Sequence, residues 1–173
     1  MGIAAEPHDE LTAVERARWR AFSLMSRRLT SAVETRLQRE ASVSSADFEV
    51  LEALSNIGDS QARAKDLAEM LSWEKSRISH QVTRMVDRGL VERTECDVDL
   101  RGSWVRLTAQ GREARARALP HYEAAVRELY LEHMSESQAV AVTDVALRIV
   151  DANTVGTCRA EIQDLEQKVR GDT

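Results

Sequence analysis

Side chains that can bind DNA bases recur at helical spacing between residues 76 and 88. The members of this stripe, and two residues beside it, are Arg77, Gln81, Arg84, Arg88, Ser76 and His80. Guanidinium and carboxamide groups pair with base edges in the major groove, and guanidinium and hydroxyl groups also bind phosphates. We therefore predict a helix with a DNA-binding face.

A second stripe on the same segment is apolar. Ile78, Val82, Met85 and Val86 lie at positions i, i+4, i+7 and i+8, the spacing of a helix face packed on a core. A helix over residues 62–71 precedes it, and a serine in the break between them, Ser72, can cap the second helix. Two helices joined by a tight turn indicate a helix-turn-helix.

Two short alternating segments follow this helix. Gly89 stands where a C-terminal helix cap is expected, and residues 90–93 and 103–107 then alternate between apolar and polar side chains. The polar residues 94–102 connect them. We predict a β-hairpin too small to have its own core, which forms a wing when it is attached to a helix-turn-helix.

Helices are also predicted before this segment. Thr12 and Glu15 have the spacing of a capping box, and the amphipathic helix after them spans ~27 residues or roughly 40 Å. This is long for a small domain, so part of the helix is expected to pack on a second subunit. Residues 41–44 break the pattern, and Ser44 and Asp47 predict the start of another helix that ends near residues 56–59.

The C-terminal part of the chain is predicted to be helical as well. After a turn at residues 108–111, apolar residues and one histidine form a seam at spacings of three and four, namely Leu119, Tyr122, Val126, Leu129 and His133. Pro120 predicts a kink or local break. Ser135 and Gln138 predict the start of a last helix, which is apolar on more than one face and should be buried on several sides. An interruption is expected at residues 153–156, and a polar helix at 159–169.

The composition favours a mostly α-helical protein, because Pro and Gly number only two and seven in 173 residues. No apolar run approaches the roughly 20 residues of a membrane span, and no signal peptide is evident. Cys96 and Cys158 have no metal-site spacing and form no disulfide framework, which favours a reduced cytoplasm. The net charge of −5 argues mildly against a general nucleic-acid binder but does not oppose specific binding.

An enzyme is not predicted from these residues. The chain has no HExxH, GxSxG, GxGxxG or phosphate-binding loop, and its four His and two Cys form no ligand cluster. We therefore predict no catalytic residue, no metal and no cofactor.

At this point two motifs resemble the multiple-antibiotic-resistance-regulator (MarR) family of bacterial transcription factors. The stretch DLAEMLSWEKSRISHQVTRMVDRGLVER at residues 66–93 is similar to the helix-turn-helix of that family. The stretch DLRGSWVRLTAQG at residues 99–111 is similar to its wing signature. The resemblance covers residues 12–153. It implies a mostly α fold with a two- or three-stranded β-wing. The winged helix-turn-helix would span residues 44–108, and helical dimerisation regions would span 12–40 and 110–168.

The resemblance also implies how DNA would be bound. Two recognition helices of a homodimer would enter successive major grooves of a near-palindromic operator, about 34 Å apart. The residues expected to contact bases and phosphates are Lys75, Ser76, Arg77, His80, Gln81 and Arg84. Arg101 would enter the minor groove from the wing, with its guanidinium held by Asp99. We predict a dimeric, sequence-specific transcriptional regulator, a repressor released by a small-molecule ligand.

Several alternatives remain open at the level of sequence. A small aromatic or anionic effector could bind among Trp19, Phe22, Met25 and Tyr122, although core packing explains these residues equally well. Cys96 or Cys158 could sense oxidants, yet no basic cluster beyond Arg93 is evident that would lower the pKa of Cys96. A winged-helix dimer could instead dock protein partners, but its docking helix would then expose aromatic residues or leucines.

Overall fold

Six α-helices, a 3-10 helix and a three-stranded sheet make up the part of the chain that the computed structural model describes, residues 10–95 and 103–153. The α-helices are α1 (Ala13–Ala41), α2 (Ser45–Ser55), α3 (Ala64–Met70), α4 (Lys75–Asp87), α5 (Ala109–Leu129) and α6 (Glu136–Asn153). The other elements are β1 (Gln61–Arg63), β2 (Val91–Glu95), β3 (Ser103–Leu107) and η1 (Leu131–His133). The predicted mostly α fold with a small sheet is confirmed.

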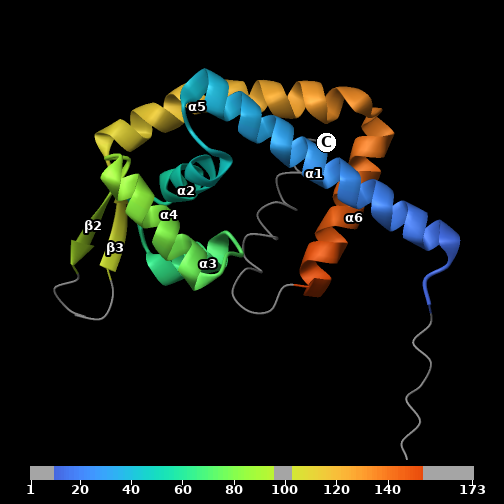
Figure 1. The fold of residues 1–173 in the computed structure, drawn as a ribbon, viewed down its shortest axis with the longest axis horizontal. Helices are drawn as coiled ribbons and strands as arrows, with labels where there is room; N and C mark the ends of the chain where they lie inside the picture. Colours follow the sequence, from blue (N-terminus) through green and yellow to red (C-terminus); the bar gives the residue numbers. More distant parts are fainter. Residues whose placement is uncertain (1–9, 96–102, 154–173) are drawn as a thin grey trace, which may run out of the picture.

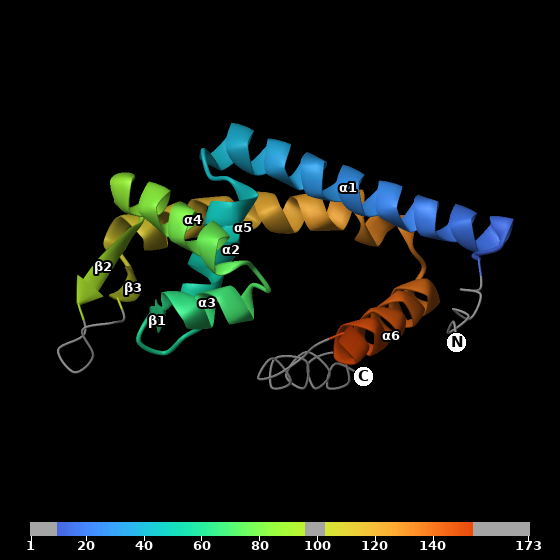
Figure 2. The same ribbon diagram turned by 60° about the horizontal axis from the view of Figure 1, so that its bottom comes forward.

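Helices α1 and α5 form a long antiparallel arm, and the elements from α2 to β3 form a winged-helix lobe at one end of it (Figures 1 and 2). The start of α1 is fixed as predicted. The Thr12 amide donates to Glu15 Oε2 at 2.7 Å, and the Glu15 amide donates to Thr12 Oγ1 at 3.2 Å. The helix ends at Ala41 because Ser42 adopts a left-handed conformation with φ 56°.

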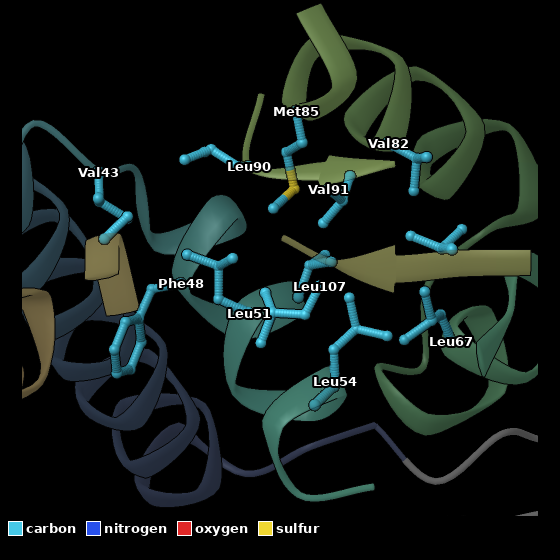
Figure 3. Close-up of a cluster of buried hydrophobic side chains, with 14 of the residues drawn as sticks. Val43, Phe48, Leu51, Leu54, Leu67, Val82, Met85, Leu90, Val91 and Leu107 are labelled. Atoms are coloured by element: carbon cyan, nitrogen blue, oxygen red, sulfur yellow. The ribbon is translucent and has the colours of Figure 1, made fainter. Parts of the chain in front are cut away.

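Helix α2 carries the centre of the hydrophobic core. Its predicted capping box is present, since Ser44 and Asp47 each accept a hydrogen bond from the other's amide at 3.0 Å. Apolar side chains from every element of the winged-helix lobe meet on it (Figure 3). Prominent members of this core are Phe48, Leu51, Leu54, Leu67, Ile78, Val82, Met85, Val91, Val105 and Leu107.

The sheet has the strand order β1-β3-β2, and both pairings are antiparallel. The hairpin was predicted from alternation, and β3 covers the predicted residues. Strand β1 was not placed by sequence: residues 62–71 were predicted as one helix, whereas Ala62 pairs with Val105 and the helix begins at Ala64. A strand of three residues is too short for alternation to reveal it.

The turn before α4 differs from the prediction at one residue. Ser72 lies in the expected tight break but does not cap α4, because its φ of 51° closes the previous helix. Glu74 is the N-terminal cap residue of α4, and it makes no capping hydrogen bond through its side chain. The other end of α4 is as predicted. Gly89 has φ 69°, and the amides of Gly89 and Leu90 donate to the carbonyls of Val86 and Met85, both at 2.9 Å.

Helix α5 runs without a break through Pro120, so the predicted local break does not occur. Proline has no amide hydrogen, so the carbonyl of Ala116, four residues before Pro120, loses its helical hydrogen-bond partner. Pro120 and Ala116 are both exposed, so water can satisfy that carbonyl. The predicted seam is helical as far as Leu129, but its four residues in α5 are only half-buried, and the buried residues of the helix are Gly111, Ala114, Ala118 and Ala125. His133 instead lies in η1, beyond the end of the helix.

Helix α6 begins at the predicted capping pair, in which the Ser135 amide donates to Gln138 Oε1 at 2.9 Å. Its burial was predicted, yet no residue of α6 is buried within one chain. The exposed fractions of Val140 and Ile149 are both 57%. The described residues of the same chain therefore leave these side chains uncovered. The predicted polar helix at 159–169 lies outside the described residues.

Candidate nucleic-acid interface

Helix α4 has one face in the core and one face at the surface. Ile78, Val82 and Met85 are at most 1% exposed and anchor the helix on the winged-helix lobe. At ~100° of rotation per residue, the opposite face is centred on the exposed residues Ser76, His80, Thr83 and Asp87. Lys75, Ser79 and Arg84 are also exposed. The surface side of α4 is therefore built from hydroxyl, imidazole and cationic groups, with one carboxylate, Asp87, at its C-terminal end.

Five of the six α4 residues predicted to contact DNA are exposed, and one is not. The exposed residues are Lys75, Ser76, Arg77, His80 and Arg84. The prediction that Gln81 faces bases is wrong, because its exposed fraction is 2%. Gln81 lies only about 60° around the helix from Ile78, so packing the apolar stripe on the core also buries Gln81. The sequence stripe that contained it is a flank of α4, not its outermost face.

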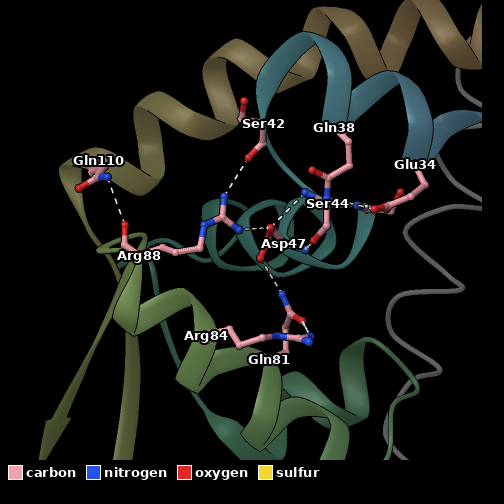
Figure 4. A network of polar contacts seen from close by, with 10 residues as sticks. Glu34, Gln38, Ser42, Ser44, Asp47, Gln81, Arg84, Arg88 and Gln110 are labelled. Atoms are coloured by element: carbon pink, nitrogen blue, oxygen red, sulfur yellow. Dashed lines mark hydrogen bonds and ion pairs between the residues drawn. The ribbon is translucent and has the colours of Figure 1, made fainter.

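Gln81 is held by a buried carboxylate on α2. Its Nε2 donates to Asp47 Oδ1 at 2.7 Å, and its Oε1 accepts a hydrogen bond from the Arg84 Nη2 (Figure 4). Arg88 also turns toward this carboxylate: its Nη1 donates to Asp47 Oδ2 at 2.6 Å, and its Nη2 donates to the Ser42 carbonyl at 2.8 Å. Arg88 thus ties α4 to the lobe and does not extend the outer face.

Arg77 is exposed but also engaged within the chain. Its guanidinium carbon lies 3.7 Å from the ring centre of Trp73, a cation–π arrangement. Burial raises the pKa of the Glu49 carboxyl on α2, whereas the positive charge of Arg77 lowers it, so Arg77 interacts electrostatically with Glu49. Trp73 is half-buried against the core. The ring of Trp73 therefore holds the Arg77 guanidinium in place at the surface.

The root of the wing is attached to α4 and to the sheet. Arg93 on β2 donates to the Ser79 carbonyl at 3.3 Å and to Thr83 Oγ1 at 3.0 Å. Trp104 on β3 is also structural, with the Arg63 guanidinium carbon 5.5 Å from its ring centre. The orientation of the hairpin relative to α4 is fixed by these contacts. The wing residues Asp99 and Arg101, and the cysteines Cys96 and Cys158, lie outside the described residues.

The four candidate effector-binding residues do not form one cluster within the chain. Trp19 and Phe22 contact each other on α1, with ring centres 5.8 Å apart, and are 65% and 53% exposed. Met25 on the same helix is 43% exposed. Tyr122 on α5 instead packs on the core residue Phe48, with ring centres 4.7 Å apart. Core packing therefore explains Tyr122 but not the three residues of α1.

Sequence reasoning missed the residue that organises this surface. Asp47 was predicted only as a helix-capping residue, which it is, but its carboxylate also binds Gln81 and Arg88. The capping signal is local, whereas the two partners lie 34 and 41 residues away in sequence. Thr83 and Ser79 could have been found, because a helical projection from Ile78 and Met85 places both toward the surface.

The described residues, 10–95 and 103–153, contain neither a metal-site cluster nor a membrane-spanning helix. Across this part of the chain, no group of three or more His, Cys, Asp or Glu side chains is arranged to hold a metal ion. None of the helices described there is both long and apolar enough to cross a membrane.

Comparisons with known proteins agree with this geometry. The sequence profile of the MarR family matches residues 41–102, which include all of α2, α3 and α4. A search of curated proteins found no match.

Among solved structures, Sco3205 from Streptomyces coelicolor, a MarR family transcriptional regulator in complex with DNA, is 27% identical with a TM-score of 0.82. That match covers 87% of this chain and 94% of Sco3205. AbsC, a MarR family transcriptional regulator from the same organism, is 32% identical with a TM-score of 0.77, over 83% of this chain and 96% of AbsC. A mutant of MarR from E. coli complexed with operator DNA shares the fold at 17% identity, with a TM-score of 0.72 over 82% and 99% of the two chains.

The identity to AbsC reaches 32% over 96% of that chain, and the family profile matches the residues of the helix-turn-helix. The chain therefore belongs to the MarR family of transcriptional regulators.

Proposed function

We propose that this protein binds double-stranded DNA as a homodimer and controls transcription by occupying a near-palindromic operator. The observation that carries the proposal is the surface face of α4. It projects from a well-packed core and carries Ser76, His80, Thr83 and Arg84. A rigid helix of 13 residues with such a face suits the major groove.

Each side chain has a defined capability toward DNA. Arg84 can donate two parallel hydrogen bonds to a guanine, the most common specific contact in the major groove. Ser76 can donate to phosphates or base edges, whereas the Thr83 hydroxyl already donates to the Ser79 carbonyl at 2.9 Å. Lys75 stands at the N-terminus of α4, where phosphates bind favourably. Lys75, Arg77 and Arg84 thus place positive charge on α4 in a chain whose net charge is −5, and the overall negative charge disfavours nonspecific binding.

The homodimer is supported by apolar side chains that one chain leaves uncovered. Leu11 lies just before α1; on α1 these side chains are Val14, Trp19, Phe22, Leu24 and Met25, and on α6 they are Val140, Val142, Val145, Ile149 and Val150. Monomeric proteins seldom expose so many large apolar side chains on two elements of the same region. A symmetric dimer through α1 and α6 would cover them and present two α4 helices to one DNA duplex. The related Sco3205 is in complex with DNA, which supports DNA binding by this fold.

Repression by promoter occupancy and release by a ligand are finer parts of the proposal. A small aromatic or anionic effector would need only a few kcal/mol of preference for one spacing of the two α4 helices. Trp19, Phe22 and Met25 are the candidates that one chain leaves exposed, so in the proposed dimer an effector would bind them between the two subunits. A screen of phenolic acids for release of bound DNA tests this part, and a hit should be lost on Trp19→Ala.

The alternative of a protein-docking winged helix is disfavoured by α4 itself. Among the large apolar residues that the described chain exposes, α4 contributes only Val86, which is 36% exposed. Protein-docking surfaces are enriched in aromatic residues, which the surface face of α4 lacks. Oxidant sensing by Cys96 or Cys158 remains a hypothesis outside the described residues.

The proposed function is tested by binding of the purified protein to the intergenic DNA beside its own gene, across a series of salt concentrations. Fluorescence anisotropy should show tight binding that prefers this DNA over random duplexes and weakens steeply with salt. Equal affinity for both DNAs at low salt would reject sequence-specific regulation and favour the protein-docking alternative.

The Arg84→Ala variant is expected to bind its operator about 1–3 kcal/mol more weakly, because a bidentate base contact is lost. The dimer should remain intact, and the melting temperature should fall slightly, because the buried Gln81 Oε1 loses its hydrogen bond from Arg84. Arg127→Ala is the matched control, an exposed arginine in the last turn of α5. The same loss of affinity in both variants would show a general charge effect and contradict the assignment of Arg84.

A further inference from the structure

The carboxylate of Asp47 joins three parts of the molecule at one buried point. Its exposed fraction is 2%, and it accepts hydrogen bonds from Ser44 N at 3.0 Å, Gln81 Nε2 at 2.7 Å and Arg88 Nη1 at 2.6 Å (Figure 4). Ser44 belongs to the turn between α1 and α2, and the other two donors lie in the middle and at the end of α4. One side chain of α2 therefore holds α4 both at its middle and at its C-terminal end.

This junction extends beyond the lobe. Arg88 Nη2 donates to the Ser42 carbonyl at the end of α1, and Gln110 Nε2 on α5 donates to the Arg88 carbonyl at 3.2 Å. Glu34 on α1 accepts a hydrogen bond from Ser45 N at 2.6 Å. The network thus connects the arm, the start of α2 and the recognition helix through polar contacts (Figure 4).

Gln81 is the link between Asp47 and the DNA-facing surface. Its carboxamide can satisfy both neighbours in only one orientation, with the NH2 group toward the Asp47 carboxylate and the oxygen toward the Arg84 guanidinium. The buried carboxylate fixes the amide, and the amide in turn fixes the guanidinium plane. A guanidinium that is oriented before binding loses less conformational freedom when it forms two bonds to a base.

We propose that Gln81 and Asp47 are specificity-determining positioning residues, which aim the Arg84 guanidinium at its base without themselves contacting DNA. This inference rests on the proposed function, because it assigns a role within the same recognition surface. A purely structural role for the pair would change stability and affinity for every DNA alike. A positioning role changes the choice of base at the position that Arg84 reads.

The test uses the full-length protein and a duplex operator obtained by selection from a random-sequence library with the wild-type protein. Binding is measured to this operator, to each single base-pair variant of it and to random DNA. The variants are Gln81→Leu, which keeps the size of the side chain but loses both hydrogen bonds, and Asp47→Asn, which keeps the shape of the buried group. Each is also combined with Arg84→Ala, and melting curves set a temperature at which all proteins are folded.

Glu52→Gln is the matched control. Glu52 on α2 accepts two hydrogen bonds from Arg115 on α5, at 2.7 and 3.0 Å, so it is another ion pair that ties α2 to a neighbouring helix. Both hydrogen bonds go to α5 and not to α4, so their loss should affect stability alone.

We expect Gln81→Leu to reduce discrimination about tenfold at the base pair that also responds to Arg84→Ala. Affinity for random DNA should change by less than about twofold, because the phosphate contacts remain. In the Arg84→Ala background, Gln81→Leu should have no further effect on base choice. Asp47→Asn should give the same pattern with a smaller effect.

Two results would overturn the inference while leaving the proposed function intact. One is wild-type discrimination in both Gln81→Leu and Asp47→Asn. The other is a loss of discrimination that is the same with and without Arg84, or that also appears in Glu52→Gln. If selection with the wild-type protein yields no preferred sequence, both the proposed function and this inference fail.

Discussion

Replacing Gly111 with alanine is expected to destabilise the protein by about 3 kcal/mol, although alanine is normally the better helix former by about 1 kcal/mol. Gly111 lies in the first turn of α5, where its amide donates to Thr108 Oγ1 at 2.9 Å. A Cβ at this position would lie 2.0 Å from the Leu90 carbonyl oxygen and 2.8 Å from Leu107 Cδ1. Neither the backbone at the root of the wing nor the buried Leu107 can move freely, so α5 and β2 must separate.

The measurement is thermal unfolding at a fixed protein concentration, with an expected fall in Tm of roughly 10 °C for a chain of this size. Gly58→Ala is the matched control, because nothing lies within 4 Å of a Cβ there. That change should be neutral or stabilise the protein by up to about 1 kcal/mol. A Gly111→Ala protein whose Tm equals or exceeds that of the wild type would contradict the close packing of α5 against Leu90.

The second large effect is expected on α6. Val142, Val145 and Ile149 form one helical stripe and are 40%, 46% and 57% exposed within one chain. Ile149→Glu places a charge in the proposed dimer interface, which costs far more than it would at a free surface. The protein should become monomeric, and its operator affinity should fall about 100-fold or more because the two half-sites are no longer bound together.

Arg148→Glu tests whether the added charge alone is responsible. Arg148 is on the polar side of α6, where it pairs with Asp144 at 2.7 Å and both side chains are largely exposed. This control should remain dimeric and bind DNA normally. Sedimentation analysis gives the oligomeric state, and anisotropy gives the affinity. A dimeric Ile149→Glu protein with normal DNA binding would remove α6 from the interface.

Local signals predicted much of this fold. The capping pairs Thr12–Glu15, Ser44–Asp47 and Ser135–Gln138 each mark a helix start, because both partners lie within one turn of chain. Alternation placed β3 and the helical stripe placed α4 for the same reason. Strand β1 was not predicted because its extended conformation depends on pairing with β3, which lies more than forty residues further along the chain.

The candidate site could be predicted only in part. Lys75, Ser76, Arg77, His80 and Arg84 are at the surface, as the residue types suggested. Gln81 is not, because a polar residue at the edge of an apolar stripe is buried if a distant partner can satisfy it. That partner is Asp47. The role of Ser72 was also predicted wrongly. Its left-handed conformation ends one helix, but from the sequence alone a serine at this position could equally begin the next helix.

The most direct test of the central claim is a footprint of the wild-type protein on its selected operator, by guanine methylation and hydroxyl-radical cleavage. Two α4 helices in successive major grooves predict two protected major-groove patches centred about 10 base pairs apart on one side of the duplex. Arg84→Ala should selectively lose protection of one guanine in each patch. A single patch, or protection of the backbone without any guanine, would contradict recognition by a pair of α4 helices.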